Sequence, residues 1–421
     1  MKLEYSSISN LLLLSRNFRI EEHDPLVSKI LESHHVFHPL YELEKSIQPI
    51  LASMEKRGLV IAEKWFRSGL EEKRIQLTKV ITEMNQFIDG THDDEVEVSR
   101  LHDFWRRNNL PVANSFDALA NYKQLHPTYK LMLQYRKHSY YLKQWGLNLK
   151  HDGVQLENGD VRIKGRWQSF ASHTGRISAK QLPLTSLPNA TRDYIVQPKD
   201  SQLVSIDLNN AELRFLAYYA KCDRLIQQFN AGEDIHYETA KLIQSKMNRH
   251  KVDDEQAREL AKRYTYSFLY GAGVKTIQRS LQKVYKDITS AEVVTINNTF
   301  IQQYPEIQKF LLERENSESM LTAFGEVKPI ARFHATQRRN FTLQSSVSVA
   351  IKMLMKTLVN HKIEVLHVLH DEVWISAAIE TNLTTLIDEV SIEFDEKIKN
   401  IFRGFPCKGL LTIEKIGGKI Q

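Results

Sequence analysis

Apolar positions in the first third of the chain recur at the three- and four-residue steps of an amphipathic helix. One such stretch runs from Pro39 to Gly58, where the glycine ends it. A second apolar stripe covers residues 65–88, and shorter ones follow at 101–108, 116–122 and 129–149. This part of the chain is therefore predicted to be mainly helical.

The pattern changes beyond residue 150. Residues 161–165 and 203–207 alternate between apolar and polar side chains as strands do, and residues 363–376 predict two strands around a tight turn. Between these strands, helical spacing returns at residues 211–220, 224–230 and 254–283. Because strands flank a large helical block, we expect an α+β domain with that block inserted between its halves.

Composition narrows the class of protein. The chain has 421 residues, 42% of them hydrophobic and 26% charged, which predicts two to four globular domains and excludes a mostly disordered chain. Cys222 and Cys407 lie far apart, so neither a disulfide framework nor a structural zinc site is indicated. The apolar run 11–14 is too short for a signal peptide or a membrane span. We expect a cytoplasmic protein without membrane contact.

Three carboxylates stand where predicted strands end. Asp207 follows the apolar run 203–206, while Asp371 and Glu372 occupy the turn between the last two predicted strands. A buried carboxylate is costly unless it is paired or binds a metal ion. Mg²⁺ prefers such oxygen ligands, and two ions about 4 Å apart stabilise the entering and leaving oxygens of phosphoryl transfer. Taken singly, each acid is equally typical of a helix cap or a turn.

A second constellation has a regular spacing. Arg258, Lys262, Tyr266 and Tyr270 follow one another at four-residue steps, and Gly271 comes next, so all are predicted to lie along one ridge of a helix. The two cations suit a triphosphate, and the two aromatic rings suit stacking on a sugar or base. The alternative is a solvated basic helix with two packing tyrosines.

Positive charge is concentrated around this ridge. The whole chain has 57 basic and 51 acidic residues, a net charge of +6. Residues 241–286 alone contain eleven basic and four acidic residues, an excess larger than that of the whole chain. Such a distribution favours a polyanionic partner.

Five segments, in this order, resemble the family A DNA polymerases, the group of bacterial DNA polymerase I. The segments are Thr-Gly-Arg-Ile-Ser at 174–178, Asp-Leu-Asn-Asn-Ala-Glu-Leu-Arg at 207–214, Gly-Glu-Asp-Ile-His at 232–236, the ridge ending in Tyr-Gly at 258–271, and His-Asp-Glu at 370–372. The resemblance covers residues 38–421 and is strongest from residue 174 onward. It suggests the polymerase domain alone, a short form without exonuclease domains, because only about 40 residues precede the first predicted helix.

The resemblance implies an α+β, right-hand polymerase fold with an antiparallel-sheet palm, helical fingers and a short helical thumb. On this reading the domains are an N-terminal arm (1–37), palm base and thumb (38–149), the first part of the palm (150–221), fingers (222–335) and the second part of the palm (336–421).

The resemblance also implies a metal centre. Asp207 and Asp371 would hold two Mg²⁺ ions, with the backbone carbonyl of Leu208 as a further ligand and Glu372 nearby. Lys262 would protonate the departing pyrophosphate. The catalytic residues would thus be Asp207, Asp371, Glu372 and Lys262, in a phosphoryl transfer that uses positioning and charge neutralisation without a covalent intermediate.

The resemblance assigns the incoming nucleotide to a set of seven residues. The triphosphate would contact His236, Arg258 and Lys262. Tyr266 would lie against the sugar, and Tyr270 with Gly271 would border the nascent base pair. Glu212 would fill the space of a ribose 2′-hydroxyl, so the substrate would be a deoxynucleotide.

The primer-template DNA would meet a further set in its minor groove. These residues are Arg176, Asn340, Gln344 and His370. Acceptors in that groove are nearly independent of sequence, so such contacts test the shape of a base pair. The expected partners are thus primer-template DNA and dNTPs, with room for a processivity or replication partner, and the expected state is a monomer.

Three departures from the family pattern bear on function. Leu-Asn-Asn-Ala at 208–211 replaces Tyr-Ser-Gln-Ile, and the segment 182–188 lacks the family's Asn and Gln, which together suggest relaxed fidelity. Tyr266 stands where many relatives have Phe, and in the family this tyrosine accompanies acceptance of dideoxynucleotides.

Two other functions stay open. The first is a single-subunit RNA polymerase-like enzyme, against which Glu212 argues, because its carboxylate blocks the ribose hydroxyl. The second is a non-catalytic DNA-binding polymerase-like module, against which the intact Asp207, Asp371, Lys262 and Arg258 argue.

Overall fold

The computed structural model describes residues 37–88, 95–246, 253–327 and 333–416. The predicted N-terminal arm (1–37) lies, apart from Phe37, outside the described residues. The chain divides into two compact units. The larger contains the described parts of 1–55, 166–180 and 200–415, and the smaller contains those of 56–165, 181–199 and 416–421.

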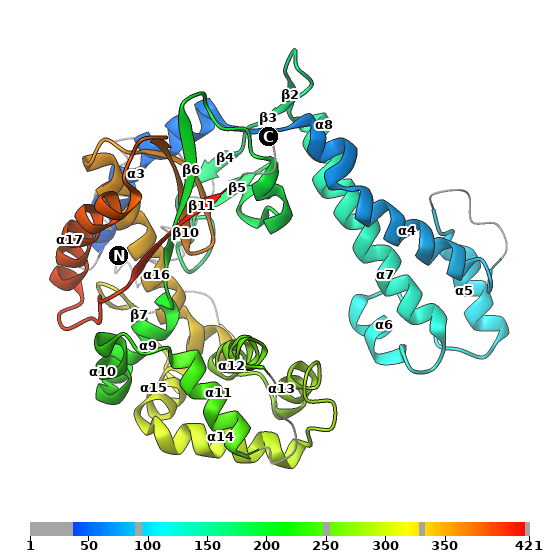
Figure 1. The fold of residues 1–421 in the computed structure, drawn as a ribbon. Coiled ribbons are helices and arrows are strands. Elements are labelled where there is room, and N and C mark those ends of the chain that lie inside the picture. Colours follow the sequence, from blue (N-terminus) through cyan, green and yellow to red (C-terminus); the bar gives the residue numbers. More distant parts are fainter. Residues whose placement is uncertain (1–36, 89–94, 247–252, 328–332, 417–421) are drawn as a thin grey trace, which may run out of the picture. The chain divides into compact units, whose positions relative to one another are not determined.

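A four-stranded sheet in the order β11-β6-β10-β9 forms the centre of the larger unit. Figure 1 labels β6, β10 and β11 of this sheet. Its strands are β6 (Ser201–Leu208), β9 (Glu364–Leu369), β10 (Glu372–Ala378) and β11 (Leu411–Ile416). β10 pairs antiparallel with both β6 and β9, and the register places Asp207 opposite Glu372. The predicted hairpin at 363–376 is therefore confirmed.

Helix α16 (Ala335–Asn360) packs against β9 and β10, and α17 (Leu383–Ile401) packs against α16. From Phe341 to Leu358 almost every α16 side chain is buried. The remaining elements around this core are α3 (Phe37–Arg57), the paired strands β4 (Arg166–Gln168) and β5 (Ser178–Lys180), and the paired strands β7 (Met320–Thr322) and β8 (Gly325–Val327).

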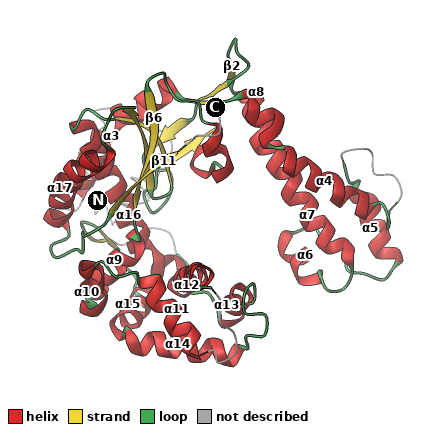
Figure 2. Ribbon diagram, viewed as in Figure 1, coloured by secondary structure: helices red, strands yellow, loops and turns green. Residues whose placement is uncertain are grey.

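Between β6 and β7 the described residues form a block of seven helices. Figure 2 shows this block in red. They are α9 (Ala211–Ala220), α10 (Asp223–Ala231), α11 (Ile235–Lys246), α12 (Asp254–Leu269), α13 (Val274–Leu281), α14 (Ser290–Gln303) and α15 (Pro305–Asn316). The prediction of α+β architecture with an inserted helical block is thus confirmed.

The prediction of one helical stretch over 254–283 is wrong, because the helix is interrupted between α12 and α13. Asp253 caps the start of α12, whose last residue is Leu269. Gly271 then adopts φ +75°, a left-handed conformation that favours glycine, and α13 starts after Gly273. Tyr270 therefore caps α12 and Gly271 lies beyond it, so the predicted ridge is helical only as far as Tyr266.

The smaller unit combines helices with a short sheet in the order β1-β3-β2. Its elements are β1 (Leu59–Ile61), α4 (Glu71–Met84), α5 (Val98–Arg107), α6 (Phe116–Tyr122), α7 (Pro127–Leu142), α8 (Leu149–Asp152), β2 (Val154–Gln155) and β3 (Val161–Ile163). Two π-helical segments, Trp65–Gly69 and Lys143–Asn148, and two 3₁₀ turns, Leu184–Ser186 and Asn189–Tyr194, complete it.

The core of the smaller unit surrounds Trp105. Its ring stacks on Tyr129 at 4.6 Å, and its indole nitrogen donates to Thr128 Oγ1 over 2.8 Å. This bond satisfies the one polar atom that burying a tryptophan would otherwise leave unpaired. Across the described parts of both units, every helix is too short or too polar to cross a bilayer.

Candidate active site

The neighbouring strands β6 and β10 bring two carboxylates to one end of the central sheet. Asp207 is the penultimate residue of β6, and Asp371 precedes β10. The backbone N–H of Leu208 donates to the Asp371 carbonyl over 2.9 Å, which ties the two chain segments together. His370 turns the hairpin with φ +55° and is exposed. The structure therefore places Asp207, Leu208 and Asp371 side by side.

Glu372 occupies a different environment. Its side chain is buried, and its Oε2 accepts a hydrogen bond from Ser205 Oγ over 2.5 Å. Ser205 lies two positions before Asp207 on β6, on the same face of the strand. Because this bond holds Glu372 within the sheet, the carboxylate braces the strand pair beside the two aspartates.

Burial controls the ionisation of the groups at this end of the sheet. It raises the pKa of Asp371 above its ordinary value; the positive charges of Arg176 and His370 counteract that rise, and the neighbouring Glu372 adds to it. Burial also raises the pKa of Tyr266, as do the charges of Glu212, Asp371 and Asp207 in turn. A cation bound here would lower the energy of the ionised carboxylates.

The donors fit Mg²⁺ better than a metal that needs a full set of side chains. Within the described residues, no group of three or more His, Cys, Asp or Glu side chains is placed to hold a metal ion. Mg²⁺ binds through one or two carboxylates and completes its shell with waters and substrate phosphates. Asp207 and Asp371, two carboxylates at one end of the sheet, match that donor set.

Glu212 lies at the start of α9 and has two partners. Its side chain is only 3% exposed. Arg176 Nη2 donates to Oε1 over 2.9 Å, and the Tyr270 hydroxyl donates to Oε2. Burial raises the pKa of this carboxyl, while the hydrogen bond from Tyr270 and the charge of Arg176 counteract the rise. The structure thus joins three predicted site residues from separate sequence motifs.

Arg258 of α12 is held by Asp234, which lies directly before the preceding helix, α11. Arg258 Nε donates to Asp234 Oδ2 over 2.5 Å. Asp234 Oδ1 in turn accepts the backbone N–H groups of His236 and Tyr237 at the start of α11. Burial acts to raise the Asp234 pKa, but these hydrogen bonds outweigh it and leave the pKa below its ordinary value. Lys262 is exposed one turn beyond Arg258.

His236 is almost fully buried, at 1% exposure. Its Nε2 lies 2.7 Å from Asn210 Oδ1, and because that oxygen can only accept, Nε2 is the donor. Burial lowers the His236 pKa to about 4, so the ring is neutral at pH 7. Its Nδ1 is buried without a hydrogen-bond partner among the described residues. A contact from His236 to a triphosphate stays a prediction.

The residues expected in the minor groove come from separate places in the larger unit. Asn340 and Gln344 lie one turn apart on α16 and are half-buried. The Asn340 carboxamide oxygen is buried and lacks a hydrogen-bond partner within the part of the chain that is described. Their DNA contacts, like those of Arg176 and His370, stay predictions.

Residues 106–399 match the family model for DNA polymerase family A, which is more than half of the chain.

The chain belongs to DNA polymerase family A.

Curated relatives agree with this assignment. The chain is 26% identical over 329 residues to DNA polymerase I of Aquifex aeolicus, covering 74% of this chain and 54% of that protein. It is 23% identical over 283 residues to DNA polymerase I of Helicobacter pylori, covering 64% of this chain and 30% of that protein. The chain thus spans about a third to a half of the length of such relatives.

A solved structure supports the fold. The POL domain of Pol1 from M. smegmatis, in complex with DNA primer-template and dNTP, matches with a TM-score of 0.69 at 18% identity. The match covers 89% of this chain and 70% of that one. The predicted family A polymerase fold is thereby confirmed.

Sequence reasoning missed four residues that hold the candidate site together. Ser205, Asn210 and Asp234 each bond to a predicted site residue, as described above. Arg339 donates to the carbonyls of Leu269 and Phe268, both over 2.9 Å, and so joins α16 to the end of α12. Asp234 lies inside the Gly-Glu-Asp-Ile-His motif, and its place one residue before a helix was a usable sign of a cap.

Proposed function

We propose that the chain is a DNA-directed DNA polymerase that adds deoxynucleotides to a primer 3′-hydroxyl. The observation that carries this proposal is the single site in one compact unit, where Asp207 and Asp371 share a sheet end and Glu212 joins Arg176 to Tyr270. Family membership supports it, as does the likeness to a polymerase domain solved with primer-template and dNTP.

Asp207, Asp371 and the Leu208 carbonyl would hold two Mg²⁺ ions. When bound, these ions would supply Lewis-acid stabilisation of the entering and leaving oxygens. In the reaction, the primer oxygen forms a bond to the α-phosphorus while the bond to the pyrophosphate oxygen breaks. The exposed Lys262 would give a proton to that departing oxygen.

The triphosphate would compete with Asp234 for Arg258. This arginine is half-exposed and already bonded to a carboxylate, so a more highly charged phosphate chain could take over its hydrogen bonds. Asp234 would keep the guanidinium in place between turnovers. Such positioning lowers the entropic cost of binding each nucleotide.

Glu212 would select the sugar. Its carboxylate is buried and tied at both oxygens, so it cannot move aside easily for a ribose 2′-hydroxyl. The Tyr270 hydroxyl contacts the same carboxylate, so any movement of Tyr270 toward the template would release one side of the gate. Asn340, Gln344 and His370 would contact the primer-template in the minor groove.

Extension of a labelled DNA primer tests this function. The wild type should lengthen the primer with dNTPs and Mg²⁺, while Asp371→Ala should not. The same gel would show any shortening of the primer, which checks the expectation that this chain has no exonuclease. Efficient extension with ribonucleotides would instead favour the RNA polymerase-like enzyme. If both proteins bound the primer-template and neither extended it, the non-catalytic module would be favoured.

A further inference from the structure

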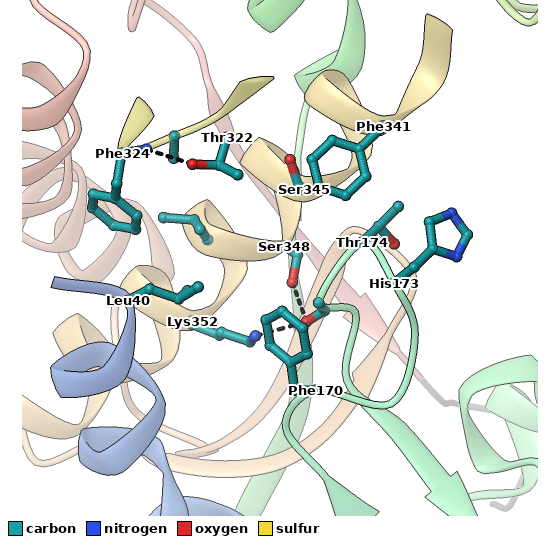
Figure 3. A pocket seen from close by; sticks show the side chains of 13 residues that line it. Leu40, Phe170, His173, Thr174, Thr322, Phe324, Phe341, Ser345, Ser348 and Lys352 are labelled. Atoms are coloured by element: carbon teal, nitrogen blue, oxygen red, sulfur yellow. Dashed lines mark hydrogen bonds between the residues drawn. The ribbon is translucent and has the colours of Figure 1, made fainter. Parts of the chain in front are cut away.

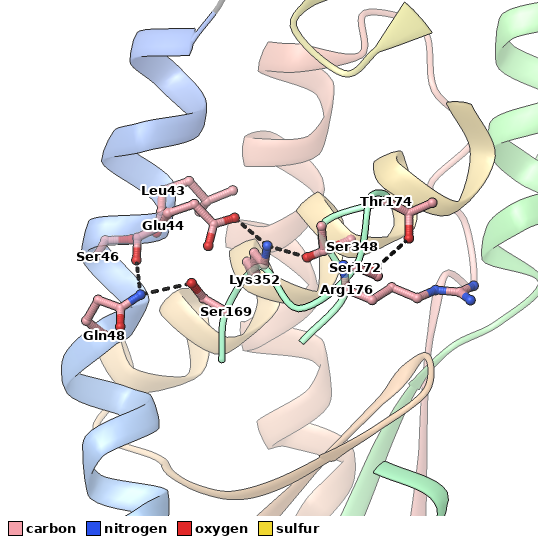
Figure 4. A network of polar contacts seen from close by, with 11 residues as sticks. Leu43, Glu44, Ser46, Gln48, Ser169, Ser172, Thr174, Arg176, Ser348 and Lys352 are labelled. Carbon is pink, nitrogen blue, oxygen red and sulfur yellow. Dashed lines mark hydrogen bonds and ion pairs between the residues drawn. The ribbon is translucent and has the colours of Figure 1, made fainter. Parts of the chain in front are cut away.

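A buried ion pair lies behind the loop that carries Arg176. Glu44 on α3 is 5% exposed and Lys352 on α16 is 1% exposed, and the Lys352 ammonium contacts Glu44 Oε1 (Figure 4). Burial raises the pKa of Glu44, and the positive charge of Lys352 counteracts that rise. Burial lowers the pKa of Lys352, and the negative charge of Glu44 counteracts that fall. Buried pairs of this kind add little net stability, and apolar replacements are often as stable. The pair therefore calls for an explanation other than stability.

Lys352 makes a second contact, to the backbone of the loop. Its Nζ donates to the Gly175 carbonyl oxygen over 2.6 Å. Ser348, one turn earlier on α16, donates its hydroxyl to the same oxygen. Figure 3 shows both side chains directed at this carbonyl. One peptide oxygen is thus held by two donors from the buried stretch of α16.

The other side of the same peptide group is also held. The Arg176 N–H, which belongs to the Gly175–Arg176 peptide, donates to Ser172 Oγ over 3.2 Å. Because a peptide group is planar, fixing its oxygen and its N–H fixes the position of the Arg176 Cα, from which the side chain leaves the backbone. Lys352, Ser348 and Ser172 therefore form a clamp on this peptide group.

The loop admits only glycine at position 175. Gly175 has φ +75°, and a Cβ atom there would lie 2.8 Å from the Phe170 ring. That ring also faces the Lys352 ammonium, 5.1 Å from its centre. The loop conformation, the aromatic ring and the buried cation thus depend on one another.

A cavity of about 20 Å³ adjoins the clamp, lined by Phe170, His173, Thr322, Phe341 and Lys352 among others (Figure 3). That volume holds about one water molecule, so it is no site for a nucleotide or other organic ligand. It does leave free space beside the loop, which would let the loop shift if a donor of the clamp were removed.

We propose that Glu44 and Lys352 are positioning residues for nucleotide addition. Glu44 keeps the Lys352 ammonium charged and in place, and the clamp then aims the Arg176 guanidinium at Glu212 and at the primer terminus. This inference rests on the proposed function, since Arg176 matters only if the chain binds a primer and a nucleotide.

The test is a double-mutant cycle between the ion pair and Arg176. Glu44→Gln/Lys352→Met removes both charges and leaves similar volumes, so it avoids an unpaired buried charge. In the wild-type background we expect kcat/KM for single-nucleotide addition to fall by about ten- to a hundredfold, the scale of a misplaced catalytic contact. In an Arg176→Ala background the same substitutions should cause almost no further fall.

Thr357→Val, a buried change on the same helix α16, is the matched control. If the ion pair had a purely structural role, its variant would lower kcat/KM equally in the wild-type and Arg176→Ala backgrounds, as the control should. That result would overturn the inference. If Glu44→Gln/Lys352→Met fails to fold, Ser348→Ala removes the other donor to the same oxygen. Ser348→Ala should cause a smaller fall in kcat/KM, and in the Arg176→Ala background it should cause almost no further fall.

Hydrogen exchange separates a failure of this inference from a failure of the proposed function. The clamp predicts faster exchange at the Arg176 amide in Glu44→Gln/Lys352→Met than in wild type or Thr357→Val, whether or not the chain extends primers. Unchanged exchange overturns the clamp. A wild type that cannot extend a primer overturns the proposed function alone, and the exchange result then stands by itself.

Discussion

Glu212 shows how single residues in this site depend on distant parts of the chain. Its two oxygens are held by Arg176 from a loop and by Tyr270 from the end of a helix. The resemblance to family A DNA polymerases pointed to each of these residues separately, through different motifs. It could not show that they bond to one another, because only the tertiary fold brings positions 36 and 58 residues apart into contact. Ser205 and Asn210 escaped prediction for the same reason.

Tyr266 is the residue on which sugar selection can be tested most simply. Its pKa is raised, so the hydroxyl stays protonated at neutral pH and can donate a hydrogen bond. That bond could replace the one lost when a nucleotide lacks its 3′-hydroxyl. We predict that Tyr266→Phe increases discrimination against dideoxynucleotides by roughly a hundredfold or more. Termination ladders measure this, and equal termination by both proteins would show that the hydroxyl has no such role.

His236 makes the stability of the chain depend on pH. Its pKa in the folded state is about 4, against an ordinary value of 6.5. Between these values the unfolded chain binds the proton and the folded chain does not, so stability falls as the pH is lowered. From pH 7 to pH 5 we expect the free energy of unfolding of the wild type to drop by roughly 2 kcal/mol more than that of His236→Gln.

Urea denaturation at the two pH values provides the comparison. Parallel losses in wild type and His236→Gln would mean that the imidazole accepts a proton in the folded protein. Either result bears on the triphosphate contact, since a neutral His236 that donates from Nε2 to Asn210 has no hydrogen on Nδ1 to offer a phosphate.

At the level of elements, apolar periodicity predicted the helices best where a capping residue or a glycine stands at the helix end. Residues 116–122 form α6 as predicted, with Ser115 capping its start. The prediction failed over 254–283, where helical spacing continues through a break that Gly271 introduces by its left-handed backbone. A helix end of this kind depends on backbone geometry, to which apolar periodicity is insensitive.

The start of α11 offers a test at this scale. Asp234 accepts two backbone N–H groups of the helix and also holds Arg258. Asp234→Ala should lower the free energy of unfolding by about 1 kcal/mol, the usual effect of losing a helix cap. Asp234→Asn keeps an acceptor oxygen for the helix and should cost less. Equal losses for the two variants in urea would indicate that the ion pair with Arg258, and not the cap, provides the stability.

On the scale of the whole molecule, the excess of basic residues in the segment 241–286 indicated a polyanionic partner. Arg249 and Lys251 of this segment lie outside the described residues. Lys275 and Arg279 are exposed on α13, four residues apart on one face. The division into two compact units was not visible from composition, since both units are assembled from separated stretches of the chain.

Salt dependence of DNA binding measures the contribution of that basic face. Each phosphate contact adds nearly one unit to the slope of log K against log salt. We predict that Lys275→Ala/Arg279→Ala reduces the slope for primer-template binding by about two. Lys356→Ala/Lys399→Ala, which removes two exposed cations from α16 and α17, is the matched control. An equal reduction in the control would mean that net charge, and not this face, sets the affinity.

The central claim is that Asp207 and Asp371 form the metal-binding centre of nucleotide addition. The most direct test is the single-turnover rate of adding one dNTP to a primer in saturating Mg²⁺, for wild type, Asp371→Asn and Glu372→Gln. We predict a fall of roughly a thousandfold or more for Asp371→Asn. Glu372→Gln should cause a smaller fall, because Ser205 holds that carboxylate within the sheet. A rate for Asp371→Asn close to that of the wild type would show that the two aspartates do not form such a centre.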